Sequence, residues 1–253
     1  SSLTLMVAWL LFQAGLWIWH ERRQASESTE NFCTLPPHYS ILLLLGATLW
    51  SLLATMQIVP SLYQGGLFVN TPIFDHAKVA IVDAIAREGL LPVNPYYAPD
   101  GQTIPLIYYY TWSFLASQLK LLAGVTGWQA EVAFNWYTGF ATLGLLCALA
   151  IRLTQRPIAG LFVILFALGG PPVDLLAPLF GPRLENWFAI PPGHGLEVLW
   201  LQMMWVPQHV LSAVAVLLLI FLLSRILSNE RLQLNYAVMT GLCVATGFGA
   251  STW

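Results

Sequence analysis

Repeated apolar runs of membrane-spanning length are the feature that most constrains the fold of this chain. Only 9% of its 253 residues are charged, whereas soluble domains carry about 25%. A helix that crosses a bilayer needs about 20 mostly apolar residues. Runs that reach or approach this length cover residues 3–19, 41–60, 108–124, 131–151, 157–180, 205–227 and 235–252. We therefore predict an all-α polytopic membrane protein with about six to seven transmembrane helices.

The chain is expected to form a single membrane domain over residues 1–253, because no internal repeat or low-complexity tract divides it. It begins with Ser1 and stops at Trp253, directly after an apolar run, so we expect a processed chain or a part of a longer protein. The run at 3–19 has no basic segment before it and no small-residue cleavage site after it. We interpret it as a span and not as a signal peptide.

Charge and motifs exclude several classes of function. The formal net charge is −2, so no basic field favours a nucleic acid partner. The sequence contains no P-loop, no Rossmann glycine motif, no serine-hydrolase elbow and no zinc-protease motif. Nucleotide-driven transport and serine hydrolysis therefore have no support. The three cysteines are scattered without metal-type spacing and are interpreted as packing residues.

The polar segment 61–107 is the best candidate for a functional site. It separates two apolar runs and carries carboxylates, a histidine and several prolines. Connections between membrane spans are usually short, and prolines fix the backbone where glycine and serine would leave it loose. A long connection of this composition indicates a site instead of a tether. We predict that 61–107 is an extracytoplasmic loop that carries it.

The positive-inside rule predicts the orientation of the chain. Three connections are basic and are assigned to the cytoplasm: Arg22-Arg23, Arg152 with Arg156, and Arg225 with Arg231. The connections 61–107 and 181–204 are then outside. This assignment conflicts with a full crossing by the run at 108–124, and the conflict disappears if that run is re-entrant, interfacial or a very short span. Both alternatives stay open, and Gln118 and Lys120 favour the second.

Asp75 and His76 lie at the start of an expected amphipathic helix that runs to about Glu88, after the helix-start signal at 70–72. This helix is expected to lie along the membrane surface with its apolar side in the interface. Asp75 is the candidate general base or metal ligand, and His76 is its candidate co-ligand or hydrogen-bonding partner. The alternative is a solvated polar face with an ion pair between Asp83 and Arg87.

The segment 92–110 is rich in proline and tyrosine. Tyrosine rings offer flat faces for sugar rings or isoprenoid chains, and their hydroxyls form hydrogen bonds. Tyr108 and Tyr109 are therefore candidate substrate-binding residues, although a structural strap with interfacial aromatic residues fits the same pattern.

Two further residues are candidates for binding an anionic substrate group. His209 lies about one turn inside the run at 205–227, where an ionisable group is costly and tends to face a cavity. It could bind a phosphate or a metal, or form a neutral hydrogen bond between helices. Arg183 could bind a phosphate through two parallel hydrogen bonds. Its alternative partner is Glu185, in a surface ion pair.

These features together resemble the C-type (GT-C) superfamily of polyprenyl-phosphate-dependent membrane glycosyltransferases. The resemblance is carried by an Asp in the first large outer loop and by the stretches REGLLPVNPYYAPDG and PLIYYYTWSFLASQLKLLAGVTG. It covers about residues 41–156, and WVPQH at 205–209 resembles a later helix start in bacterial members. The chain departs from the family in two respects. The family commonly pairs two acidic residues where Asp75 is followed by His76, and the run at 3–19 precedes the helix that matches the family's first.

The resemblance implies transfer of a sugar from a polyprenyl-phosphate donor in the bilayer to an acceptor glycan, lipid or protein. The site would face the periplasm or exterior of a bacterial inner membrane, with Asp75 as base or as a ligand of a divalent cation such as Mg²⁺ or Mn²⁺. A non-catalytic lipid or sugar transporter would instead require polar residues buried in the middle of several spans. A structural subunit of a larger membrane complex, with protein partners, is the third alternative.

Overall fold

The computed structural model describes residues 35–56, 58–68, 72–169, 199–228 and 234–250. At a few of these positions, among them 72–76, it describes the backbone alone. The predicted span 3–19 and the basic pair Arg22-Arg23 lie outside the described residues.

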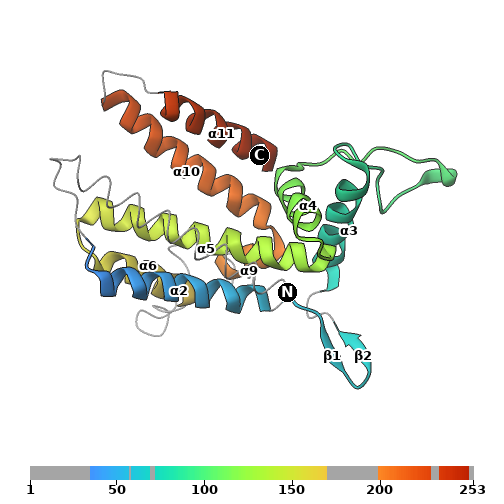
Figure 1. The fold of residues 1–253 in the computed structure, drawn as a ribbon, viewed down its shortest axis with the longest axis horizontal. Coiled ribbons are helices and arrows are strands. Elements are labelled where there is room, and N and C mark those ends of the chain that lie inside the picture. The colour runs from blue at the N-terminus through green and yellow to red at the C-terminus, as the bar shows by residue number, and fades with distance from the viewer. Residues whose placement is uncertain (1–34, 57, 69–71, 170–198, 229–233, 251–253) are drawn as a thin grey trace, which may run out of the picture.

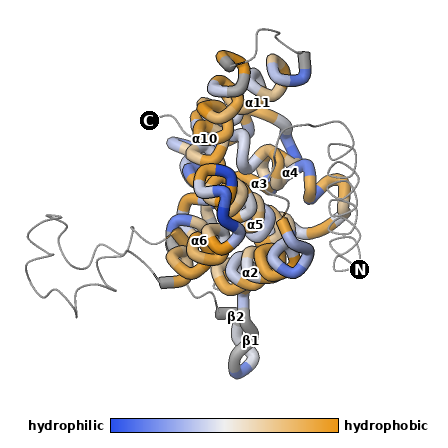
Figure 2. Tube along the Cα trace, turned by 90° about the vertical axis from the view of Figure 1, so that its left-hand side faces the viewer, coloured by the Kyte–Doolittle hydropathy of each residue, from blue (hydrophilic) through white to orange (hydrophobic). Residues whose placement is uncertain are grey.

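Three of the described helices are long and apolar enough to cross a membrane, as expected for an integral membrane protein. They are α2 (Pro37–Met56), α5 (Gly127–Thr154) and α10 (Pro207–Ser228). Each coincides with an apolar run of the sequence. The shorter apolar helices α6 (Ile158–Gly169) and α11 (Leu234–Ala250) match two more runs. Figure 2 shows that α2, α6, α10 and α11 are predominantly hydrophobic along their lengths.

The long helices lie alongside one another, and two shorter helices gather at one end of them (Figure 1). These two are α3 (Pro72–Glu88) and α4 (Thr111–Ala123), which pack on each other and on the beginning of α5. A third short helix, α9 (Leu199–Trp205), leads into α10. We call this the α3–α4 end of the molecule.

Glycines allow α2 and α6 to approach closely. A Cβ atom at Gly46 would lie 2.8 Å from Ile164 Cδ1, and one at Gly160 would lie 2.8 Å from Leu43 Cδ2. Small residues at helix contacts are a common way to pack helices in a membrane, where dispersion contacts replace the hydrophobic effect. Trp50 Nε1 also donates a hydrogen bond of 3.0 Å to the Ala167 carbonyl, so polar and apolar contacts together hold this helix pair.

The run at 108–124 forms only the 13-residue helix α4. At 1.5 Å per residue such a helix reaches about 20 Å, which is less than the roughly 30 Å of a hydrocarbon core. The start of α4 lies against the end of α11, where a Cβ atom at Gly249 would meet Thr111, and its first half packs on α5 through Trp112 and Ala116. The length of α4 therefore favours the second of the two alternatives, a re-entrant, interfacial or very short span.

Helix α3 ends at Glu88 as predicted, where Gly89 adopts a positive φ of 87° and its N–H donates to the Ile85 carbonyl. The expectation for its apolar side was wrong. Val82 and Ile85 are 0% and 2% exposed. Val82 packs in a cluster with Trp112 of α4 and Ala130 of α5. The apolar side is therefore covered by protein and not by the membrane interface, because α4 turns back over it.

A short hairpin precedes α3 and was not expected in an all-α protein. Strands β1 (Ser61–Tyr63) and β2 (Gly66–Phe68) pair antiparallel, with Leu62 opposite Leu67. The turn residues Gln64 and Gly65 both have positive φ, as two-residue hairpin turns require. The hairpin projects from the α3–α4 end (Figure 1).

The basic residues Arg152 and Arg156 lie at the other end of the long helices. Arg152 is in the last turn of α5, and its guanidinium lies 5.3 Å from the ring centroid of Phe221 in the second half of α10. The length of α5 separates these arginines from α3 and α4, which pack near its beginning.

Candidate functional site

The proline- and tyrosine-rich segment 89–110, which we call the strap, is folded back on itself. The Asn94 N–H donates to the Ile104 carbonyl, and the Leu106 N–H donates to the Pro92 carbonyl, both at 2.8 Å. The Asn94 side chain accepts hydrogen bonds from the N–H groups of Tyr96 and Tyr97. These bonds close the strap into a loop. The backbone that carries its tyrosines is therefore held in place.

Tyr96 fastens the strap to α3. Its hydroxyl donates a hydrogen bond to the Ala77 carbonyl, while its ring is half-exposed. Burial raises the pKa of Tyr96 to about 12, and the negative charge of Glu131 contributes to the rise. The Tyr96 hydroxyl therefore stays protonated over the physiological range and can serve as a lasting donor.

Tyr108, Tyr109 and His209 come together although they are distant in the sequence. The ring centroids of Tyr108 and Tyr109 lie 4.0 Å apart, and those of Tyr109 and His209 lie 5.4 Å apart. His209 is in the first turn of α10, which places this contact at the α3–α4 end. Burial raises the pKa of Tyr108, and its hydrogen bond with Tyr109 adds to the rise. Three residues that the sequence singled out separately thus share one surface.

A groove of about 610 Å³ opens beside this cluster. Its walls are mostly aliphatic and aromatic and come from the strap, the start of α4 and the end of α11. The lining residues are Leu90, Ile107, Tyr108, Tyr109, Tyr110, Thr111, Phe114, Phe248 and Gly249. A surface of this kind suits an apolar chain better than a free sugar, because most of its lining surface is apolar.

Asp75 and His76 are the fourth and fifth residues of α3, which lies at the same end of the molecule. Their side chains are outside the described part of the structure. Neighbouring positions on a helix are about 100° apart around its axis, so residues i and i+1 do not face each other. A shared metal ion is therefore not favoured by this spacing. Among the side chains that the structure describes, no group of three His, Cys, Asp or Glu residues could hold a metal ion.

Arg183 and its alternative partner Glu185 lie outside the described residues. The end of the predicted outer connection 181–204 is helical, because α9 begins at Leu199.

A buried ion pair at this end was missed by the sequence interpretation. Lys78 Nζ of α3 lies 3.2 Å from Glu131 Oε1 of α5, and the two side chains are 9% and 0% exposed. The same ammonium donates a hydrogen bond of 2.5 Å to the Met204 carbonyl of α9. Lys78 has apolar neighbours in the sequence, and Glu131 is the first residue of an apolar run. Nothing local in the sequence indicates that the two meet.

Glu131 begins a buried polar stripe on α5. The stripe continues with Asn135, Thr138 and Thr142, and this 4-3-4 spacing places all of them on one face of a helix. Trp112 Nε1 of α4 donates a hydrogen bond of 3.1 Å to Thr138 Oγ1. The Asn135 side chain is 1% exposed and makes no hydrogen bond within the described part of the chain. The spacing of these polar residues was the available signal for the stripe.

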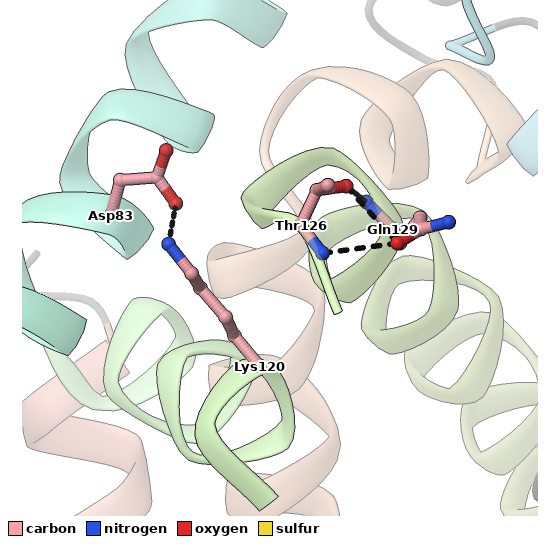
Figure 3. A network of polar contacts seen from close by, with 4 residues as sticks. All are labelled: Asp83, Lys120, Thr126 and Gln129. Atoms are coloured by element: carbon pink, nitrogen blue, oxygen red, sulfur yellow. Dashed lines mark hydrogen bonds and ion pairs between the residues drawn. The ribbon is translucent and has the colours of Figure 1, made fainter. Parts of the chain in front are cut away.

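The polar face of α3 has different partners from those expected. Asp83 pairs with Lys120 of α4, at 2.6 Å (Figure 3). Arg87 pairs with Glu88, at 2.7 Å. The expected pair between Asp83 and Arg87 is therefore wrong. Lys120 lies in the last turn of α4, where it can reach back to α3. The ion pair explains why a lysine occurs within an otherwise apolar run.

The N-terminus of α5 lies beside the ion pair between Asp83 and Lys120. Thr126 and Gln129 form a capping box, in which each side chain accepts a hydrogen bond from the other residue's N–H (Figure 3). Gly127 follows the cap, and a Cβ atom there would lie 2.2 Å from Asp83 Oδ1. Glycine at this position thus lets the Asp83 carboxylate approach the positive end of the helix.

Comparison with known proteins gives one informative relative. The chain is 37% identical over 208 residues to "Uncharacterized protein y4nK" of Sinorhizobium fredii. The matched region covers 82% of this chain and 31% of the relative, so the chain spans about a third of the length of that protein. No protein-family model and no solved structure matches the sequence.

Proposed function

We propose that this chain belongs to a membrane glycosyltransferase of the polyprenyl-phosphate-dependent GT-C kind. One observation supports the proposal most. Tyr108 and Tyr109 at the end of the strap meet His209 at the start of α10, beside a groove suited to an apolar chain, and the helix that carries Asp75 and His76 lies at the same end of the bundle. The donor would be a polyprenyl-phosphate sugar, and the acceptor would be a glycan, lipid or protein.

The α3–α4 end would face the exterior, which is the periplasm if the protein lies in a bacterial inner membrane. Arg152 and Arg156 are at the opposite end of α5. Basic connections are retained on the cytoplasmic side. A lipid-linked sugar could then enter the groove from the outer leaflet without leaving the membrane.

Asp75 would act as the general base that removes the proton from the acceptor hydroxyl. A sugar hydroxyl is a poor nucleophile, and positioned proton transfer contributes about 10²–10⁴-fold to a rate. His76 and His209 would assist by hydrogen bonding, and Arg183 would bind the donor phosphate. Tyr108 and Tyr109 would contact the donor where its apolar chain meets its polar head.

The test is the Asp75→Asn variant of the full protein in membrane vesicles. The vesicles would receive a panel of radiolabelled polyprenyl-phosphate hexoses, and both sugar transfer and polyprenyl phosphate release would be measured. Asp75→Asn should lower transfer by about 100-fold or more. Asp100→Asn is the matched control, because Asp100 is an exposed aspartate of the strap whose positive φ asparagine tolerates.

Near-normal transfer by Asp75→Asn would overturn the role of that residue. Absence of transfer by the unchanged protein with every member of the panel would overturn the proposed reaction.

A second function is favoured by the buried polar residues. Ser51 and Thr55 in the last two turns of α2 are buried, as is the polar stripe that runs from near the start of α5 to its middle, and a lipid or sugar transporter would need buried polar residues on several spans. This alternative predicts movement of a labelled polyprenyl-phosphate hexose between leaflets without release of its sugar. A quenching assay on the same vesicles distinguishes the two functions.

A further inference from the structure

We propose that Lys78 is a positioning residue that holds the N-terminal half of α3 against the end of α9, immediately before the start of α10. Its ammonium, paired with Glu131, attaches α3 to α9, and α9 leads directly into α10. The attachment brings the turn that carries Asp75 and the turn that carries His209 into one fixed arrangement. The inference deepens the proposed function and rests on it for the meaning of that arrangement.

The contacts of Lys78 join three elements at a single atom. Nζ lies 3.2 Å from Glu131 Oε1 of α5 and donates to the Met204 carbonyl of α9 at 2.5 Å. Lys78 follows Asp75 by about one helical turn. The adjacent residue Ala77 accepts the hydrogen bond from Tyr96, so the strap is attached at the same turn. Four segments of the candidate site therefore meet around Lys78.

The Met204 carbonyl needs a donor from outside its own helix. The last four carbonyls of a helix have no partner within it. Met204 is in the last turn of α9, and Pro207, which has no N–H, begins α10 immediately afterwards. A lysine ammonium at a helix C-terminus also interacts favourably with the helix dipole. Lys78 thereby fixes the break between α9 and α10, which sets the direction in which α10 and His209 begin.

Stability alone is a weak reason for burying this ion pair. Glu131 is 0% exposed in a helix long enough to span a membrane, and desolvating two charges is expensive. Well-packed apolar residues of similar volume often stabilise a protein as well as a buried ion pair does. What an apolar pair lacks is direction, whereas the ammonium donates to the Met204 carbonyl and lies against the Glu131 carboxylate at the same time.

The experiment uses a double variant that carries both Lys78→Met and Glu131→Met, and it compares this variant with the unchanged protein in detergent. Removing both charges avoids an unpaired buried carboxylate, so the double variant should fold. We expect hydrogen exchange to rise about tenfold or more in residues 72–79 and 199–205, since their attachment is lost. Transfer of the hexose that the unchanged protein uses should fall by about tenfold or more.

Two single variants serve as controls. Lys78→Arg keeps a cationic donor and should retain both low exchange and transfer. Lys120→Met removes the partly exposed ion pair with Asp83, which is on the same helix as Lys78. This variant should leave hydrogen exchange in 199–205 unchanged.

The possible results separate the two proposals. A folded double variant with unchanged exchange and unchanged transfer would overturn the positioning role. Increased exchange together with undiminished transfer would overturn it as well, because the arrangement would then have no bearing on the reaction. If the unchanged protein transfers no hexose, the proposed function fails, while increased exchange in the double variant still upholds the attachment by Lys78.

Discussion

At the scale of single residues, Gly127 determines how closely the Asp83 carboxylate of α3 can approach the start of α5. A Cβ atom at this position would lie 2.2 Å from Oδ1 and 2.8 Å from Cγ of Asp83. Gly127→Ala should displace the Asp83 carboxylate from Lys120 and lower the free energy of unfolding by about 1–3 kcal/mol. Denaturant unfolding in detergent measures the change.

Gly144→Ala is the matched control on the same helix, since no atom lies within 4 Å of a Cβ there. It should be neutral or slightly stabilising, because alanine favours helix more than glycine does. Equal unfolding free energies for the two alanine variants would contradict the close contact.

The contacts of the Glu88 carboxylate should make the local stability of the strap near Val93 depend on pH. The hydrogen bond from the Val93 N–H, and then the bond from Arg87, lower the pKa of this carboxyl. Because the pKa is lower in the folded than in the unfolded chain, the contribution to stability is present above the unfolded pKa. It is lost as the pH falls through the folded pKa. Amide protection of Val93, corrected for intrinsic exchange, should therefore fall in acid, and Glu88→Gln should abolish that acid step.

At the scale of elements, α4 is held in place by one large side chain. Trp112 is 1% exposed, packs with Val82 and Ala130, and donates a hydrogen bond to Thr138. Trp112→Ala should cost about 3–5 kcal/mol, because it leaves a cavity and removes that bond. Thermal or denaturant unfolding measures the loss.

Leu122→Ala is the control from the same helix, since Leu122 is 87% exposed and its loss should change the stability little. Similar losses for both variants would show that α4 is not anchored by Trp112.

At the scale of the whole molecule, the strap and the connection between α5 and α6 should lie on opposite sides of the membrane. Asp100 is an exposed residue of the strap, and Arg156 is an exposed residue of that connection. Asp100→Cys should react with an impermeant maleimide added outside intact cells, whereas Arg156→Cys should react only after permeabilisation. The background is a variant with Cys33→Ser, because Cys147 and Cys243 are buried. Labelling of both positions from one side would contradict the orientation.

The local properties of the chain were enough to predict the class of protein and several element boundaries. Hydropathy over about 20 residues identifies a span whatever its neighbours are, and α2, α5 and α10 follow the runs that the sequence defines. The end of α3 at Glu88 was equally local, since Gly89 stops the helix by its own backbone preference. Tyr108, Tyr109 and His209 were selected by residue type and position at a membrane edge. Their shared surface appeared only in the folded molecule.

Pairings between distant segments were decided by the tertiary structure. Lys78 with Glu131 and Asp83 with Lys120 depend on how α3 crosses α4 and α5, and helix crossing is a property of packed surfaces, not of local sequence. The same packing turned the apolar side of α3 toward protein and kept α4 at one end of the bundle. Hydropathy thus determined which segments enter the membrane, while side-chain packing determined which polar groups meet within it. The residues next to a charged side chain in the sequence do not indicate which distant residue it will pair with once it is buried.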